Sequence, residues 1–283
     1  ALPICLWYHS SHSQHLDHPH PTRTLHSALI SLNQLLSWLS VQFIRLTISI
    51  CDISCVIMSR LEGWSEGWAA GRTSFHRTFV DKSLLEFQSK LLVKKPSRVL
   101  VPLCGKTLDM RWLAEEGHEV VGVEGVIQAV MEFFEEQELP YKESDVPGIK
   151  GAKLFENEDK KIKIYLCDFF QFSKDFAGQF DAIWDRGSLV AIDPSLRQQY
   201  TDLLLSVLSP GGRILNEVFE YNPEEREPKG PPHCVPEEDI QKFFGERFSI
   251  QLLVNVDILE DVPYFKDVGL TWIKQKIRIM TPQ

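Results

Sequence analysis

A glycine-rich phosphate-binding loop is missing from this sequence. Dinucleotide-binding folds need three glycines, spaced G-x-G-x-x-G, so that backbone can approach a pyrophosphate at the start of a helix. The turn in the corresponding place, residues 102–105, carries only Gly105. A nicotinamide dinucleotide is therefore a poor candidate ligand, and an oxidoreductase is disfavoured.

Positive charge is also scarce. The chain has 30 Lys and Arg against 39 Asp and Glu, which gives a formal net charge of −9 at pH 7. A nucleic-acid-binding protein usually carries a basic surface, so we expect no nucleic-acid partner. The 283 residues are 43% hydrophobic, which is enough to bury one sizeable core.

The cysteines lack the spacing of a metal site. Three of the six fall within residues 1–57, and the others, Cys104, Cys167 and Cys234, are far apart, with no CxxC pair among them. Reduced thiols in a cytoplasmic protein fit this pattern best. We expect no bound metal.

Residues 1–57 differ in composition from the remainder. They contain no Lys, Glu, Gly or Met, they hold six of the nine histidines, and the first methionine is Met58. We interpret residues 1–57 as a non-native or disordered extension and expect residues 58–283 to form the folded domain.

Two functional interpretations of this N-terminal part remain open. The six histidines between residues 9 and 26 are spaced closely enough to share a metal ion, although Asp17 is the only carboxylate among them that could orient an imidazole. The apolar residues 25–58 could form a signal anchor. Five polar or charged residues interrupt any clean span of about 18 apolar residues: Asn33, Gln34, Gln42, Arg45 and Asp52. We expect no membrane contact.

Residues 98–124, RVLVPLCGKTLDMRWLAEEGHEVVGVE, form the most informative segment. A β-branched run, a short turn, an apolar helical repeat ending at Gly117, and a second valine-rich run predict strand, turn, helix and strand. Glu124 ends the second strand, where doubly wound sheets place an acid that binds ribose hydroxyls. A nucleoside cofactor without phosphates, such as S-adenosylmethionine, fits this segment, and a solvated strand-end glutamate is the alternative.

The remaining pattern predicts one α/β domain with an N-terminal helical cap over residues 58–92. Strands are predicted at residues 99–101, 119–123, 161–166, 180–184, 212–219, 248–259 and 271–280, and helices at 110–116, 126–138, 195–208 and 236–244. About a dozen residues join the last two strands, too few for a helical crossover, so they should form an antiparallel hairpin. By analogy of fold, we expect a seven-stranded, mostly parallel, Rossmann-like class I methyltransferase sheet.

Four segments carry a family resemblance. They are GWSEGWAAGRTSFH at 63–76, VPLCGKTLDMRWLAEEGHEVVGVE at 101–124, FDAIWDRGSLVAI at 180–192 and KGPPHCVPEEDI at 229–240. In this order and spacing the chain resembles the thiopurine S-methyltransferases over residues 58–283. The resemblance implies S-adenosylmethionine-dependent S-methylation of aromatic or heterocyclic thiols such as thiopurines, by a cytoplasmic monomer of xenobiotic metabolism.

The resemblance also assigns cofactor-binding residues. Glu124 should bind the ribose, and Leu103 and Gly105 should border the aminoacyl tail. Asp168 should accept a hydrogen bond from the adenine amine, and Phe169 should flank the adenine ring, although an aromatic residue there is as often part of the core.

The resemblance places the other site residues on the cap and after the fourth strand. Trp64, Trp68 and Phe75 should cover the cofactor, with Phe75 also facing the substrate, although the tryptophans could simply pack the helix on the sheet. Arg186 should lie over the carboxyl edge of the sheet, contact the cofactor and align an anionic thiol. Asp185 either orients Arg186 or caps the following turn.

The chemistry needs little base catalysis, because a thiol is partly ionised at neutral pH. No obligatory base is assigned, and His76 and Asp185 are candidates for proton handling. Family members tend to carry an arginine between the last two strands, whereas this chain has Lys266, which leaves the physiological substrate open. A halide or small-thiol methyltransferase and a non-catalytic cofactor-binding protein are the alternatives, and intact Glu124 and Arg186 argue against the second.

Overall fold

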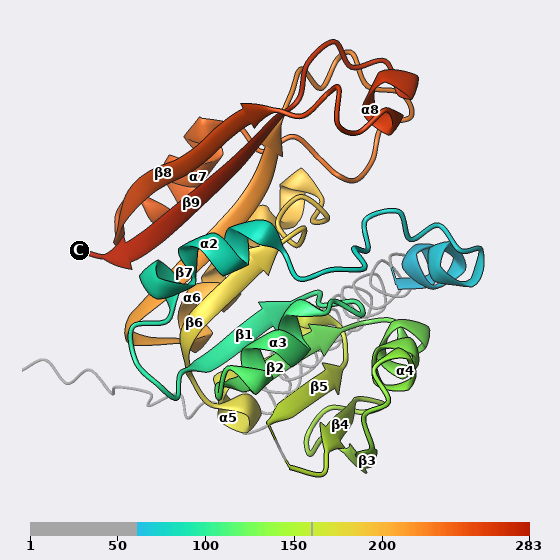
Figure 1. Ribbon diagram of the computed structural model, residues 1–283, viewed down its shortest axis with the longest axis vertical. Coiled ribbons are helices and arrows are strands. Elements are labelled where there is room, and N and C mark those ends of the chain that lie inside the picture. The colour runs from blue at the N-terminus through green and yellow to red at the C-terminus, as the bar shows by residue number, and fades with distance from the viewer. Residues whose placement is uncertain (1–60, 160) are drawn as a thin grey trace, which may run out of the picture. The chain divides into compact units, whose positions relative to one another are not determined.

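The computed structural model describes residues 61–159 and 161–283. The expected extension over residues 1–57, with its histidine group and apolar run, lies outside the described residues. Within the described part, a twisted sheet runs through the centre and helices cover both of its faces (Figure 1). Among the described residues, none of the helices combines the length and the hydrophobicity of a membrane span.

The sheet of the described residues has nine strands in the order β3-β4-β5-β2-β1-β6-β7-β9-β8. Their bounds are β1 Arg98–Pro102, β2 Glu119–Glu124, β3 Tyr141–Asp145, β4 Lys153–Asn157, β5 Ile162–Leu166, β6 Phe180–Arg186, β7 Leu208–Glu220, β8 Phe248–Asp257 and β9 Lys274–Pro282. The five neighbours β5, β2, β1, β6 and β7 are parallel, whereas β9 is antiparallel to both β7 and β8. The predicted parallel core and terminal hairpin are therefore confirmed.

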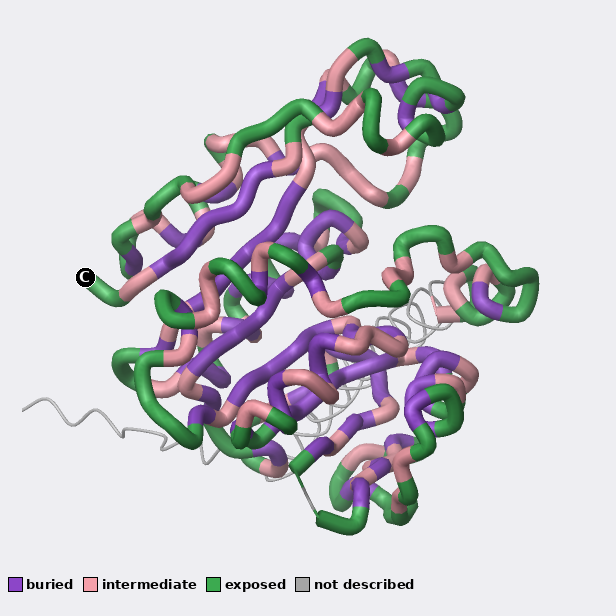
Figure 2. The backbone as a smooth tube through the Cα atoms, viewed as in Figure 1, coloured by how far each residue is buried: buried purple, intermediate pink, exposed green. Residues whose placement is uncertain are grey.

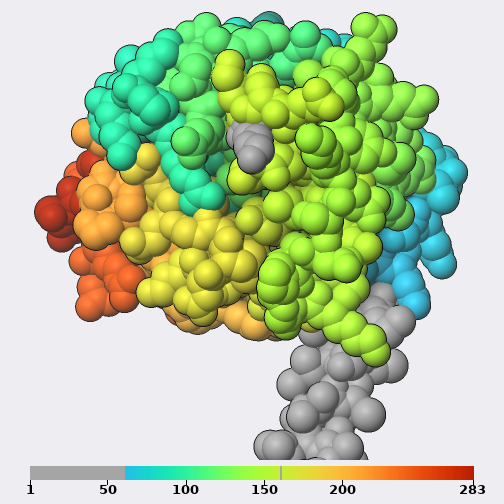
Figure 3. All heavy atoms as spheres, turned by 90° about the horizontal axis from the view of Figure 1, so that it is seen from below, coloured from blue at the N-terminus to red at the C-terminus, as the bar shows by residue number. Residues whose placement is uncertain are grey.

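The predicted number of strands, seven, is wrong. β3 and β4 form an antiparallel hairpin that extends the sheet beyond β5, and Figure 3 shows their green segments on the side opposite the C-terminal strands in orange and red. After Tyr141, all the residues of β3 are exposed and none is apolar, so no alternation of apolar and polar residues marks the strand. Instead, Lys153 of β4 pairs with Glu143 and Asp145 across the hairpin.

The helices of the described part are α2 Lys82–Leu91, α3 Asp109–Glu115, α4 Ile127–Glu136, α5 Lys174–Ala177, α6 Arg197–Val207, α7 Glu237–Phe244 and α8 Tyr264–Asp267, and residues 61–69 are also helical. Alternate residues of β1 divide the core between the two faces. Val99 and Val101 pack with α2, α3 and α4, whereas Leu100 packs with α6 and α7. Figure 2 shows the resulting buried track along the central strands, the pattern of a parallel sheet covered on both sides.

The predicted N-terminal cap consists of the helical residues 61–69, an irregular stretch and α2. The irregular stretch, residues 70–81, passes over the carboxyl ends of the central strands (Figure 1). At its end Asp81 caps α2, because its side chain accepts a hydrogen bond from the backbone N–H of Ser83 at 2.9 Å. We call residues 61–81 the cap segment.

Gly122 in the middle of β2 tests this packing. A Cβ at this position would lie 2.6 Å from Cys104 Sγ and 2.9 Å from Met110 Sδ, and both side chains are buried. We expect Gly122→Ala to lower the free energy of unfolding by about 1–3 kcal/mol through overpacking, measured by urea denaturation. Gly67→Ala is the control, because nothing lies within 4 Å of that position, and it should be neutral or slightly stabilising. Equal stability of the two variants would contradict the packing described.

Candidate functional site at the carboxyl edge of the sheet

The sequence-predicted residues gather where the parallel strands end. Glu124 ends β2, Arg186 ends β6, and Leu103 and Gly105 follow β1 directly. Ligands of open α/β sheets bind at this carboxyl edge, in the crevice outside the strand ends. The cap segment crosses the same edge, so residues from both halves of the chain meet there.

Glu124 is buried and its carboxylate holds three backbone groups. Oε2 accepts the N–H of Gly105 at 2.8 Å, and Oε1 accepts those of Gly125 and Val126 at 2.8 and 2.9 Å. Burial raises the pKa of Glu124, and the three hydrogen bonds oppose that rise. An ionised carboxylate offers about four acceptor positions, so about one is left for a ligand hydroxyl.

The turn after β1 has an unusual backbone. Leu103 and Gly105 have φ values of +43° and +52°, in the left-handed region that a leucine rarely adopts. Hydrogen bonds fix the turn on both sides, from Gly105 N–H to Glu124 and from Ser188 Oγ to the carbonyl of Pro102 at 2.7 Å. The turn is therefore a rigid border of the site.

Phe75 contacts both tryptophans of the cap segment, and the predicted contact of these three residues with a cofactor stays a prediction. The ring centroid of Phe75 lies 6.0 Å from that of Trp64 and 5.8 Å from that of Trp68, both in edge-to-face geometry. Trp68 is buried against Val126 and Ala129 at the start of α4, which matches the packing alternative. Phe75 remains 45% exposed, so its ring has a surface to offer a ligand.

Lys106 joins the turn to α4, a connection that sequence reasoning missed. Its ammonium lies 2.7 Å from Glu132 and 2.6 Å from Glu136, and 5.9 Å from the centroid of the Trp68 ring. Burial, together with the charge of Lys106, lowers the pKa of His76.

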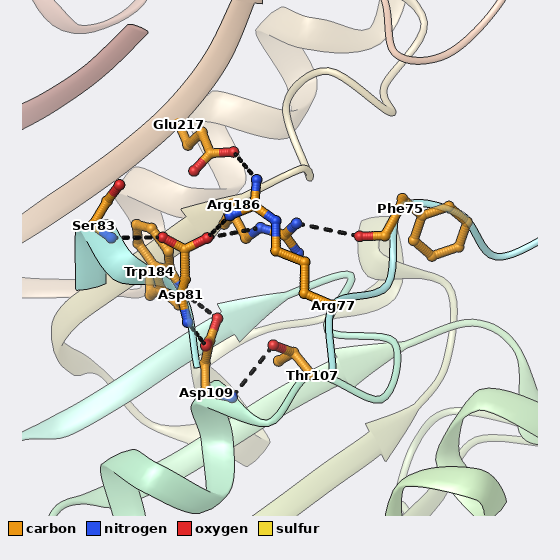
Figure 4. A network of polar contacts seen from close by, with 9 residues as sticks. All are labelled: Phe75, Arg77, Asp81, Ser83, Thr107, Asp109, Trp184, Arg186 and Glu217. Carbon is orange, nitrogen blue, oxygen red and sulfur yellow. Dashed lines mark hydrogen bonds and ion pairs between the residues drawn. The ribbon is translucent and has the colours of Figure 1, made fainter. Parts of the chain in front are cut away.

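Arg186 is held by the cap segment. Its Nε lies 3.4 Å from Asp81 Oδ2, and its Nη2 donates a hydrogen bond to the carbonyl of Phe75 at 3.2 Å (Figure 4). The sequence predicted the place of Arg186 but not these partners. Its assigned role, alignment of a substrate, stays a prediction.

The contacts of Asp81 extend this group into a buried network. Its carboxylate also pairs with Arg77, and its backbone N–H donates to Asp109 Oδ1 at 2.8 Å. Asp109 Oδ2 in turn accepts the indole N–H of Trp184 at 2.8 Å. Arg77 Nη2 lies 3.5 Å from Glu217 Oε1, so two guanidinium groups and three carboxylates share this part of the edge (Figure 4).

Asp185 caps the turn after β6, one of its two predicted roles. Oδ1 accepts the backbone N–H of Leu189 at 3.2 Å and Oδ2 accepts the hydroxyl of Tyr200 at 3.2 Å. The side chain is fully buried toward α6, and burial raises its pKa to about 6. Its hydrogen bonds thus join it to the turn and to α6.

Asp168 and Phe169 follow β5 as predicted. Asp168 is buried and accepts the backbone N–H of Phe170 at 3.1 Å, which starts a short 3-10 turn. The ring of Phe169 packs in the core, 6.1 Å from Phe172 and 5.0 Å from Tyr200 between centroids. The core alternative therefore describes Phe169, and its contact with an adenine ring stays a prediction.

The segment between the last two strands, β8 and β9, holds Lys266, but a different cation, Arg226, is buried against it. Lys266 lies on α8 and pairs with Glu260 at 2.6 Å, with both side chains largely exposed. The guanidinium that reaches this loop is that of Arg226, which is 3% exposed and donates to the carbonyl of Pro231 at 2.8 Å and the hydroxyl of Tyr264 at 3.5 Å. Sequence reasoning missed Arg226, because its segment, NPEEREPKGPP, reads only as a polar turn region.

Comparisons with known proteins bear on this geometry. A family model described as "Thiopurine S-methyltransferase (TPMT)" matches residues 59–283. The chain is 46% identical over 222 residues to a "Probable thiopurine S-methyltransferase" of Danio rerio, a match that covers 78% of this chain and 94% of the relative. It is 39% identical over 222 residues to thiopurine S-methyltransferase of Bos taurus, covering 78% and 89%.

Two solved structures share the fold. One is the 1,6-didemethyltoxoflavin-N1-methyltransferase of Burkholderia thailandensis with bound 1,6-didemethyltoxoflavin and S-adenosylhomocysteine, with a TM-score of 0.51, 15% identity, and coverage of 81% of this chain and 88% of that one. The other is a SAM-dependent methyltransferase of Methanosarcina mazei, with a TM-score of 0.51, 16% identity, and coverage of 72% and 99%. At these identities the likeness shows the α/β fold typical of class I methyltransferases.

Asp185 offers a test of the site's electrostatics without any ligand. Because its pKa is about 6 in the fold and about 3.9 in an unfolded chain, only the unfolded state loses the proton between these values. Ionisation of Asp185 therefore destabilises the fold as pH rises through that window and adds nothing below pH 4. The quantity to compare is the free energy of unfolding of wild type and of Asp185→Asn. We expect the difference, wild type minus variant, to fall by about 1–3 kcal/mol between pH 4 and pH 7. Urea denaturation of both proteins measures it, and a pH-independent difference would contradict the raised pKa.

Proposed function

Because this chain belongs to the thiopurine S-methyltransferase family, we propose that it transfers the methyl group of S-adenosylmethionine to the sulfur of an aromatic or heterocyclic thiol such as a thiopurine. The relatives at 46% and 39% identity carry that activity in their names. The buried carboxylate of Glu124 is the observation that supports the proposal most. It keeps a hydrogen-bond acceptor position for a ligand, and it lies beside the turn after β1, which has a single glycine.

The residues at the edge fit this cofactor. Glu124 retains room for a ribose hydroxyl in addition to its three backbone donors. The turn at Leu103 and Gly105 lacks the glycines that a pyrophosphate requires, but it can border an aminoacyl tail. The other proposed cofactor contacts are Trp64, Trp68, Phe75, Asp168, Phe169 and Arg186.

When bound, the cofactor supplies a methyl group already activated on a sulfonium, so the chain contributes alignment and a dry site. Trp64, Trp68 and Phe75 form an apolar cluster on the cap segment that can exclude water. The carbonyl of Phe75 accepts a hydrogen bond from Arg186, so the segment that carries this aromatic cluster also orients the guanidinium.

The acceptor thiol must lose a proton before or during transfer. An aromatic thiol is substantially ionised at neutral pH, so the proton can leave to solvent before binding. His76 is the candidate that could take it from a thiol that binds protonated, although burial lowers the pKa of this imidazole and so weakens it as a base. We propose that Arg186 then holds the thiolate opposite the donated methyl through its planar donors.

We also propose a cytoplasmic monomer that acts on xenobiotic thiols and takes no nucleic-acid partner. The free thiols of Cys104, Cys167 and Cys234 support a reducing compartment. The net charge of −9 disfavours a polyanionic partner.

Removal of the Glu124 carboxylate tests the cofactor site. We expect Glu124→Ala to weaken S-adenosylmethionine binding by about 1–3 kcal/mol, because ribose and backbone donors lose their acceptor. Isothermal calorimetry measures the change. Glu119→Ala, at the exposed start of the same strand, is the control and should bind as wild type does. Equal affinities for all three proteins would refute the ribose assignment, and a nicotinamide dinucleotide should bind none of them.

Arg186→Lys tests substrate alignment. The variant keeps the charge but loses the planar pair of donors, so kcat/KM for a thiopurine should fall by roughly tenfold to a thousandfold. Steady-state kinetics with 6-mercaptopurine measure it, and cofactor affinity should change less than turnover. Arg111→Lys, on the exposed face of α3, is the matched control. A wild-type rate in Arg186→Lys would place the substrate elsewhere. A loss of cofactor affinity larger than the loss of turnover would make Arg186 chiefly a cofactor ligand and would contradict its role in substrate alignment.

A further inference from the structure

Glu217 lies beside Arg186 and has no part in the function proposed above. β6 and β7 pair in parallel with Arg186 opposite Glu217, so both side chains leave the same face of the sheet at its carboxyl edge. Glu217 is 2% exposed, and although the side chain of Gln275 lies close enough to lower its pKa, its Oε2 makes no hydrogen bond of full geometry in the described part of the chain. A buried carboxylate is costly unless nearby positive charge offsets it.

Arg77 and Arg186 provide that positive charge. Arg77 Nη2 lies 3.5 Å from Glu217 Oε1 and also pairs with Asp81, while Arg186 Nε lies 3.4 Å from Asp81 (Figure 4). Arg186 and Arg77 both oppose the rise that burial and Asp81 impose on the pKa of Glu217. The guanidinium of Arg186, which we assign to the substrate, is thus not an isolated cation. The carboxylates of Asp81 and Glu217 lie beside it and beside Arg77.

We propose that Glu217 is a positioning residue that sets the charge preference of the acceptor site. Acting with Asp81, it neutralises Arg77 and Arg186, so that thiols without a carboxylate are methylated more readily than thiols that carry one. This inference rests on the proposed function, because it specifies which thiols that activity uses.

The chemistry of the transfer agrees with a neutralised guanidinium. As the substrate sulfur bonds to the methyl carbon, the electron pair of the broken carbon–sulfur bond stays on the donor sulfur, and the thiolate loses its charge. A bare guanidinium would stabilise the charged ground state more than the transition state, and would slow the reaction. Glu217 reduces that excess stabilisation, and the same negative charge repels a carboxylate elsewhere on the substrate.

Two matched probes measure this preference. Thiophenol and 4-mercaptobenzoate share the same ring and sulfur, and differ by a carboxylate on the far side of the ring. At pH 8 both thiols are ionised, and kcat/KM is measured for each. Wild type should prefer thiophenol.

The variants are Glu217→Gln and, as a control, Glu220→Gln. Glu220 is on the same strand but pairs with Lys276 on the opposite face. In Glu217→Gln the ratio of kcat/KM should shift by about three- to thirtyfold toward 4-mercaptobenzoate, the effect of one charge several ångströms away in a partly screened site. Glu220→Gln should keep the wild-type ratio within about twofold, since its charge is remote.

An unchanged ratio in Glu217→Gln, with both thiols still methylated, would overturn this inference and leave the proposed function intact. A wild type that binds S-adenosylmethionine but methylates neither thiol nor a thiopurine would overturn the proposed function, and this inference with it. Thermal melts followed by circular dichroism report folding. If Glu217→Gln does not fold, Glu217→Asp takes its place. This variant keeps the negative charge, so it must keep the wild-type ratio, and a changed ratio would overturn the inference. A wild type that does not prefer thiophenol would also refute it.

Discussion

The carboxylate of Glu124 is the constraint on which the rest of the site depends. It pairs with Gly105 after β1 and with Gly125 and Val126 before α4, and Val126 has no side-chain cap of its own. One carboxylate therefore fixes the turn and starts the helix that carries the partners of Lys106. The proposed contact with a ribose would therefore use a carboxylate that the fold already holds in place through its hydrogen bonds to both neighbouring segments.

The charged network at the ends of β6 and β7 adds a second constraint. Arg186 and Asp81 join strand and cap segment, and the carbonyl of Phe75 brings the aromatic cluster into the same arrangement. Burying this many charges is tolerable only if they offset one another. One short stretch of chain therefore connects the aromatic cluster of the cap segment to the guanidinium of Arg186.

The sequence predicted those parts of the fold that apolar spacing encodes. The five parallel strands and the final hairpin follow from valine- and isoleucine-rich runs and from a short last connection. The β3–β4 hairpin could not be predicted, because after Tyr141 its first strand carries no apolar residue, and the buried ring that anchors the hairpin, Phe155 of β4, contacts Tyr141 across the strands. The position of Glu124 at the carboxyl edge of the sheet was predictable, because this residue ends a predicted strand. The pair of Arg186 with Asp81 was not, because no local pattern brings together residues so far apart in the chain.

The most direct test of this account is the position of a transferred methyl group. Incubation of the protein with S-adenosylmethionine carrying a ¹³C-labelled methyl and with 6-mercaptopurine offers sulfur and ring nitrogens as acceptors, and the carbon chemical shift of the product identifies the atom methylated. The account predicts a labelled S-methyl product formed in proportion to enzyme. Label on a ring nitrogen, or no enzyme-dependent product from a folded protein that binds the cofactor, would contradict it.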